Sequence, residues 1–123
     1  MHEYAIVDTM VRQLLDQLRQ QGAERVVEVR FRRGSTFMEE PLRQGFEALA
    51  AGTPLEGARL VIETVNLEYR CECGHAQVVT NDDLIGHMFV CPQCGVVREV
   101  RDAHDLELME VVVEDAAPPR NDD

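Results

Sequence analysis

The sequence predicts an α+β fold in which two helices lie on a small three-stranded sheet and a cysteine-rich domain is inserted before the last strand. Three observations support this prediction: two segments with a helical period, three segments with strand-like alternation, and two closely spaced pairs of cysteines between the second and third strands. A chain of 123 residues has room for one modest hydrophobic core and a small additional module, which excludes large multidomain enzymes.

Two helices are expected in the first half of the chain. Through residues 4–21 the apolar side chains recur at spacings of three and four, which is the period of an amphipathic helix. These side chains belong to Val7, Met10, Val11, Leu14 and Leu18. Gly22 follows, and glycine ends helices readily because it adopts the left-handed conformation without steric cost. After a turn expected at residues 33–36, Pro41 in a first-turn position and Gly52 as the stop bound a second, shorter helix.

Three segments alternate in the manner of half-buried strands. Residues 25–32 place valine and phenylalanine on one face and charged side chains on the other, which predicts a sheet with a solvated charged face. Residues 59–65 form the second predicted strand and residues 106–114 the third. In the third strand the alternation slips between Leu108 and Val111, which suggests a bulge.

These elements define the expected domain organisation. Residues 1–68 and 101–115 are expected to form one α/β domain, and residues 69–100 a second domain inserted into it. Residues 116–123, with two prolines and terminal acids, are expected to be a disordered tail.

The charge of the chain restricts its partners and location. It carries 12 basic and 23 acidic residues for a net charge of −11, a sign that repels phosphate backbones and argues against a nucleic-acid partner. No apolar stretch approaches the ~20 residues needed to span a bilayer. Glu3 and Asp8 stand where a signal peptide would be basic and apolar, so we expect a cytoplasmic protein. All the basic residues are arginine, and without lysine the chain cannot contain a phosphate-binding loop of its own.

The cysteines follow the spacing of a metal site. Cys71 and Cys73 form the first pair and Cys91 and Cys94 the second, so that two turns can each offer two thiolates to Zn²⁺ in a zinc-ribbon-like domain. Such a closed set leaves no open coordination position, which indicates a structural and not a catalytic metal. The first pair is tighter than the usual C-x-x-C, and His75 is an alternative ligand in place of Cys71. Iron or free thiols are the remaining alternatives.

The first three residues could form a second metal site. The amine of Met1, the imidazole of His2 and the backbone nitrogens of His2 and Glu3 can form fused chelate rings, which suit the nitrogen-rich square-planar sites of Ni²⁺ or Cu²⁺. The large side chain of His2 is expected to prevent removal of Met1. The alternative is that His2 is an ordinary exposed residue.

The ordered combination of these features resembles the HypA family of nickel metallochaperones, which help to mature [NiFe] hydrogenases. The features are Met1-His2-Glu3 before an amphipathic helix, the stretch at residues 52–58, and cysteine pairs followed by a last strand that ends with residues 110–114. The resemblance runs from Met1 to about Glu114. No single motif is decisive, and the first cysteine pair departs from the C-x-x-C usual in the family.

The resemblance implies a function that is not enzymatic. It implies that Met1, His2 and Glu3 bind transferable Ni(II), that the four cysteines bind structural Zn(II), and that Glu39 is the nearest candidate for a further acidic group at the nickel. It also implies two partners, a hydrogenase maturation GTPase and the large subunit of [NiFe] hydrogenase.

Two other classes of protein fit the residues. A zinc-stabilised protein–protein adaptor would share the fold but would have no role for nickel. A rubredoxin-like electron carrier would hold iron on the same cysteines.

Overall fold

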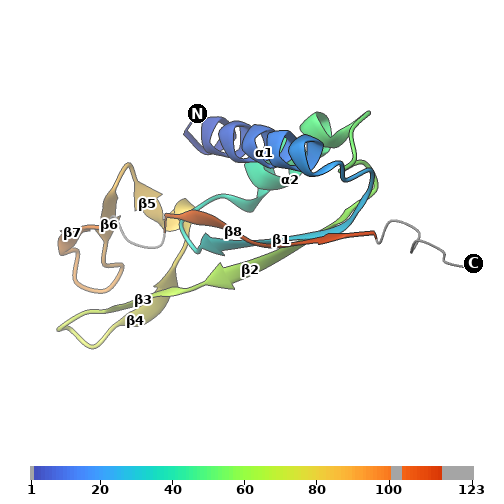
Figure 1. Cartoon of the computed structure of the whole chain (residues 1–123). Helices are drawn as coiled ribbons and strands as arrows, with labels where there is room; N and C mark the ends of the chain where they lie inside the picture. The colour runs from blue at the N-terminus through green and yellow to red at the C-terminus, as the bar shows by residue number, and fades with distance from the viewer. Residues whose placement is uncertain (1, 101–103, 115–123) are drawn as a thin grey trace, which may run out of the picture. The chain divides into compact units, whose positions relative to one another are not determined.

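A computed structural model of the chain describes residues 2–100 and 104–114 (Figure 1). It confirms the α+β class, with two helices and small sheets. The elements in order are α1 (His2–Gln21), β1 (Val26–Gly34), α2 (Glu39–Ala50), β2 (Arg59–Val65), β3 (Leu67–Arg70), β4 (Ala76–Val79), a 3-10 turn (Asn81–Asp83), β5 (Leu84–Ile85), β6 (Met88–Val90), β7 (Val97–Glu99) and β8 (Leu106–Val113).

The chain divides into two compact units. The first comprises residues 1–31, 39–61 and 108–123, and the second comprises residues 32–38 and 62–107. Strands β1, β2 and β8 each continue from one unit into the other along the chain, in a sheet of order β2-β1-β8. The tail predicted at residues 116–123 lies outside the described residues.

The core of the first unit forms where the apolar helix faces meet β1. In α1 the buried residues are Val7, Val11, Leu14 and Leu18, which are four of the five that the helical period predicts. In α2 the ring of Phe46 packs edge-on against Phe31 of β1, with centroids 6.4 Å apart. Both helices lie on the same side of β1 (Figure 1), so that their apolar stripes and the alternate residues of the strand share one core.

The ends of α1 and β1 differ from the sequence prediction. Helix α1 begins at His2, two residues before the predicted start, and ends where predicted, because Gly22 has a φ of 71° and Ala23 donates to the carbonyl of Leu18 at 3.0 Å.

The turn predicted at residues 33–36 was wrong in its first half. Gly34 stays in the strand, because its N–H donates to the carbonyl of Asp105 at 2.9 Å, and the chain turns only from Ser35.

The other face of β1 carries charged side chains from Glu28 onward, as the alternation predicts, but the prediction was wrong at the start of the strand, where Val26 is buried and Val27 is exposed. In the first unit Glu28 pairs with Arg30 at 3.2 Å and with Arg59 at 3.0 Å, and Arg30 lies 3.6 Å from Glu110. Glu28 and Arg30 are partly buried, but ion pairs open to solvent on one side contribute little, about 0–1 kcal/mol each, so the buried face provides most of the stability. Strand β8 shows no regular alternation of burial from Leu108 to Glu110, where the sequence suggests a bulge.

The second unit is built from short strands. A hairpin pairs β3 with β4 in antiparallel register, with Leu67 opposite Val79, and a separate sheet has the order β5-β6-β7. Ser35 joins the segment after β1 to the hairpin, because its hydroxyl donates to the carbonyl of Val79 at 2.6 Å and accepts from the N–H of Leu67 at 3.0 Å. The buried Phe89 of β6 provides the apolar centre of the small sheet.

The two helices of the first unit are in close contact at Gly45 and Val7. A methyl group built on Gly45 would lie 2.9 Å from Cγ1 of Val7, a distance that requires a shift. Val7 is fully buried and β-branched, so it has little freedom to rotate away. The crossing therefore needs a residue without a side chain at position 45.

We expect Gly45→Ala to lower the free energy of unfolding by about 1 kcal/mol, since overpacking of 1–3 kcal/mol outweighs the helix-propensity gain of about 1 kcal/mol. In a Val7→Ala background the same substitution should become stabilising, because the obstructing methyl is gone. Urea unfolding of the two single variants and the double variant measures this change of sign. A stabilising effect of equal size in both backgrounds would show that the helices do not meet at these residues.

Candidate metal centres

The second unit brings the four cysteines together. Their sulfur atoms all lie within 4.8 Å of one another, with Cys71 3.6 Å from Cys94 and Cys73 3.7 Å from Cys91. Four sulfurs at ~2.3 Å from a tetrahedral Zn²⁺ would be about 3.8 Å apart, whereas a disulfide requires about 2.05 Å. The cluster therefore has the spacing of a tetrahedral tetrathiolate site, and all four thiols are free.

Two similar turns present the sulfurs. In the first, Gly74 donates to the carbonyl of Cys71 at 2.9 Å, and in the second Gly95 donates to the carbonyl of Cys91 at 2.9 Å. Both glycines have positive φ, 102° at Gly74 and 80° at Gly95, as expected for residues placed just after each pair. Each turn folds its two cysteines toward one point.

Without a cation the four thiols cannot all ionise at this spacing. The hydroxyl of Tyr69 and the backbone N–H of Cys73 lower the pKa of Cys71 to about 6. At Cys73 the backbone N–H of His75 favours the thiolate, but burial and the neighbouring sulfurs of Cys71 and Cys91 raise the pKa to about 12.

The second pair divides in the same way. Burial opposes ionisation of Cys91, but the backbone N–H groups of Cys94 and Gln93 outweigh it and lower the pKa of this thiol. The sulfur of Cys94 accepts a hydrogen bond from the backbone N–H of Val96, which favours the thiolate. The nearby Cys71 sulfur and burial nevertheless raise the pKa of Cys94. A bound divalent cation would remove this conflict, because coordination deprotonates a thiol outright.

His75 does not join the cysteines. Its Nε2 lies 2.7 Å from Oε1 of Gln77, and the metal-ligand group found among the described residues contains the four cysteines alone. The geometry thus favours Cys71 over His75 as the fourth donor.

The proposed nickel residues lie at the edge of what the structure describes. Met1 and the side chain of His2 are outside the described residues, so the structure does not bring this set together. It does show that α1 starts at His2. The first four N–H groups of a helix have no acceptor within the helix, so the amide nitrogens of His2 and Glu3 are not needed for its hydrogen bonds.

The start of α1 is fixed against α2 within the first unit. Tyr4 donates through its hydroxyl to Oε1 of Gln44 at 2.6 Å, and Gln44 in turn donates to Glu40 at 3.0 Å. Glu39, suggested above as an acidic group near nickel, accepts from Nε of Arg43 at 2.6 Å.

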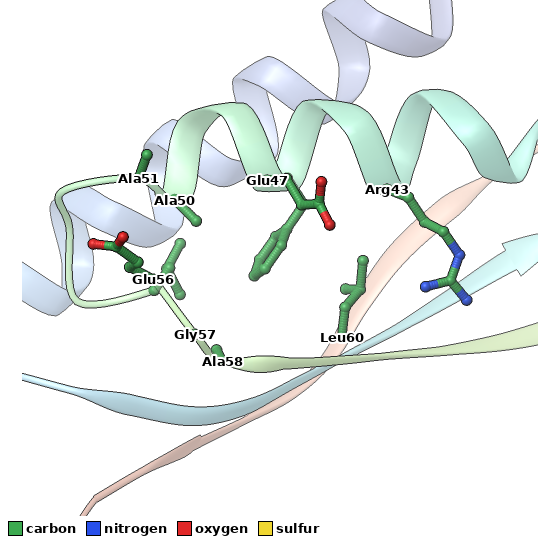
Figure 2. Close-up of a pocket in the computed structure, with 10 residues that line it drawn as sticks. Arg43, Glu47, Ala50, Ala51, Glu56, Gly57, Ala58 and Leu60 are labelled. Carbon is green, nitrogen blue, oxygen red and sulfur yellow. The ribbon is translucent and has the colours of Figure 1, made fainter.

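A cavity of about 390 Å³ lies between α2 and the loop before β2 (Figure 2). Its walls combine apolar and charged side chains, and two of the charged groups have partners: Glu56 accepts from the N–H of Gly52 at 3.0 Å, and Arg43 pairs with Glu39. The cavity contains no histidine or cysteine, so it offers no soft metal site. Its lining consists of Arg43, Phe46, Glu47, Ala50, Ala51, Leu55, Glu56, Gly57, Ala58 and Leu60.

Neither helix in the described part of the chain is long and apolar enough to cross a membrane.

The sequence patterns did not indicate that Tyr69 lies beside the metal-ligand cluster. The chain has only two tyrosines, and one of them stands two residues before the first cysteine. Residues at i and i+2 of an extended segment point to the same side, so the spacing was an available signal.

Comparison with known proteins connects this fold and cysteine cluster to nickel metallochaperones. The family model described as "Hydrogenase/urease nickel incorporation, metallochaperone, hypA" matches residues 1–113. A hydrogenase maturation factor HypA from Roseiflexus sp. is 36% identical over 121 residues, covering 96% of each chain. One from Methanothermobacter thermautotrophicus is 37% identical over 99 residues, which cover 77% of this chain and 81% of the relative.

A solved structure supports the fold. The solution structure of the Ni metallochaperone HypA from Helicobacter pylori matches with a TM-score of 0.53 at 19% identity and covers 90% of this chain and 96% of that one. The chain thus matches a metallochaperone family, whose members are not catalysts. It belongs to the HypA family, whose members act in hydrogenase maturation together with partner proteins.

The cysteine geometry yields a direct test of the donor set. We expect Cys71→Ser to lose most of the bound metal and His75→Ala to retain it, because the sulfur belongs to the cluster and the imidazole pairs with Gln77. Elemental analysis of both variants, purified beside the unaltered protein, gives the metal content. Loss of metal in His75→Ala with retention in Cys71→Ser would mean that the ligand set is the alternative one.

Proposed function

We propose that the chain binds Ni(II) through Met1, His2 and Glu3 and delivers it during maturation of [NiFe] hydrogenase. The observation that carries this proposal is the match to the nickel-incorporation family model, which begins at residue 1 and so includes these three residues. The donors would be the Met1 amine, the His2 imidazole and backbone nitrogens of His2 and Glu3, a nitrogen-rich set that suits Ni²⁺.

The start of α1 leaves amide nitrogens available for nickel but does not attract a cation. Its first N–H groups have no helical acceptor, so coordination by the amide nitrogens of residues 2 and 3 breaks no helical hydrogen bond. The positive end of the helix dipole also opposes a cation there, by about 0.3–1 kcal/mol. This penalty is small beside the chelate, and it favours release to an acceptor, as transfer requires.

We further propose that Cys71, Cys73, Cys91 and Cys94 hold Zn(II) as a structural ion. The spacing of the sulfurs fits tetrahedral coordination, and four thiolates leave no open position for cargo. When bound, the ion supplies folding free energy to strands that are too short to be stable alone. In this proposal residues 69–100 form the zinc domain, and residues 1–68 and 101–115 form the nickel domain.

The proposed partners are a maturation GTPase and the large subunit of [NiFe] hydrogenase, in the cytoplasm. The family to which the chain belongs acts in hydrogenase maturation. The chain has no lysine for a phosphate-binding loop, so any nucleotide-driven step requires another protein.

Nickel titration of the untagged protein tests the proposal. We expect His2→Ala, and a form with one additional N-terminal residue, each to bind nickel at least about tenfold more weakly, because the first removes the imidazole and the second displaces the amine from the chelate. His87→Ala is the matched control, since it removes an exposed histidine of the second unit. Mass spectrometry should confirm that Met1 carries a free amine.

The outcome separates the nickel carrier from the adaptor. An adaptor that uses zinc only for its structure would show the same nickel affinity in all four proteins. That result would end the assignment of nickel to the N-terminus and leave the zinc proposal intact.

A further inference from the structure

The hydroxyl of Tyr69 is an unexplained polar group beside the cysteine cluster. Its oxygen is buried, yet within the described residues it makes no hydrogen bond of regular geometry. A buried hydroxyl without a partner costs about 1–3 kcal/mol. Phenylalanine at this position would keep the ring and avoid that cost, so the hydroxyl calls for a role.

The surroundings of Tyr69 lie entirely within the second unit. Its ring packs on that of Phe89, with centroids 4.6 Å apart and planes inclined at 57°. Arg98 is directly opposite Phe89 in the register of β6 and β7. The contact with Phe89 therefore holds the tyrosine against the small sheet.

The sulfur nearest in sequence is that of Cys71. Two residues separate Tyr69 from Cys71 where β3 runs into the first turn. Residues two apart in an extended segment point to the same side, which places the Tyr69 side chain, in β3, on the side of the Cys71 sulfur that follows the strand. The buried hydroxyl therefore has the Cys71 thiolate as a strongly charged acceptor on its own side.

We propose that Tyr69 is a positioning residue of the zinc centre, with its hydroxyl donating a hydrogen bond to the Cys71 sulfur when the four thiolates hold the ion. This inference rests on the proposed zinc site. The hydrogen bond satisfies the buried hydroxyl, fixes the rotamer of Cys71 and draws negative charge from its sulfur. Outer donors of this kind typically change metal affinity by 10–100-fold.

The donor also compensates for the short first pair. Cys71 and Cys73 are separated by one residue and Cys91 and Cys94 by two, so the first turn has fewer backbone N–H groups with which to orient its sulfurs. A side-chain donor from β3 supplies what the shorter turn lacks.

Tyr69→Phe tests the role of the hydroxyl in the full-length, zinc-loaded protein. The matched control is Tyr4→Phe, which removes the other tyrosine hydroxyl, bound to Gln44 in the first unit. We expect Tyr69→Phe to transfer zinc to a chelating dye about tenfold faster at fixed pH, and Tyr4→Phe to match the unaltered protein. In the cobalt-substituted protein, Tyr69→Phe should also shift the sulfur-to-cobalt charge-transfer band.

A second variant separates the hydrogen bond from packing. Phe89→Leu removes the ring contact but keeps the hydroxyl, so it should shift the charge-transfer band less than Tyr69→Phe does. The proposal is overturned if Tyr69→Phe equals the unaltered protein in both measurements, or if Phe89→Leu shifts the band to the same extent. If the unaltered protein carries no cysteine-bound metal, the zinc assignment fails first and this inference fails with it.

Discussion

Four cysteine sulfurs within 4.8 Å of one another impose the constraint on which the second unit depends. Four thiolates at that spacing repel, and the thiols divide into two with lowered and two with raised pKa values. A divalent cation converts this repulsion into attraction. The strands around the cluster have two to four residues each, too few to form stable sheets unaided, so in our proposal metal binding and folding of this region are one process.

The first unit is stabilised in a different way. Its stability comes from the apolar stripes of α1 and α2 against β1, with Phe31 and Phe46 at the centre and no metal required. This independence suits a carrier, since a cargo ion can arrive and leave without unfolding the body that presents it. In our proposal the two ions are thus kept apart by chemistry: sulfur for the permanent one and nitrogen for the transferable one.

Sequence periodicity was sufficient to predict the helices and strands that bury one face and expose the other. The stripe of Val7, Val11, Leu14 and Leu18, the stop at Gly22 and the strand at Arg59–Val65 all lie where the pattern predicts them. The cysteine spacing likewise predicted the cluster, because two paired turns have few ways to satisfy four thiolates.

The misses have physical causes. Strands β3 to β7 are too short to show a period, and they are organised by the metal-ligand turns and by Phe89, not by an alternating pattern. Gly34 looked like part of a turn, but a long-range acceptor at Asp105 keeps it extended. The place of Tyr69 beside Cys71 was signalled only by the i, i+2 spacing, and a strand as short as β3 shows no period that would mark this spacing as extended.

X-ray absorption spectroscopy of protein loaded with one nickel and one zinc distinguishes the two proposed sites, because each edge reports the ligands of its own metal. We expect a nickel shell of nitrogen and oxygen without sulfur, and a zinc shell of four sulfurs at about 2.3 Å. Sulfur in the nickel shell, or nitrogen in place of one zinc-bound sulfur, would show that the two metals are not divided between these sites.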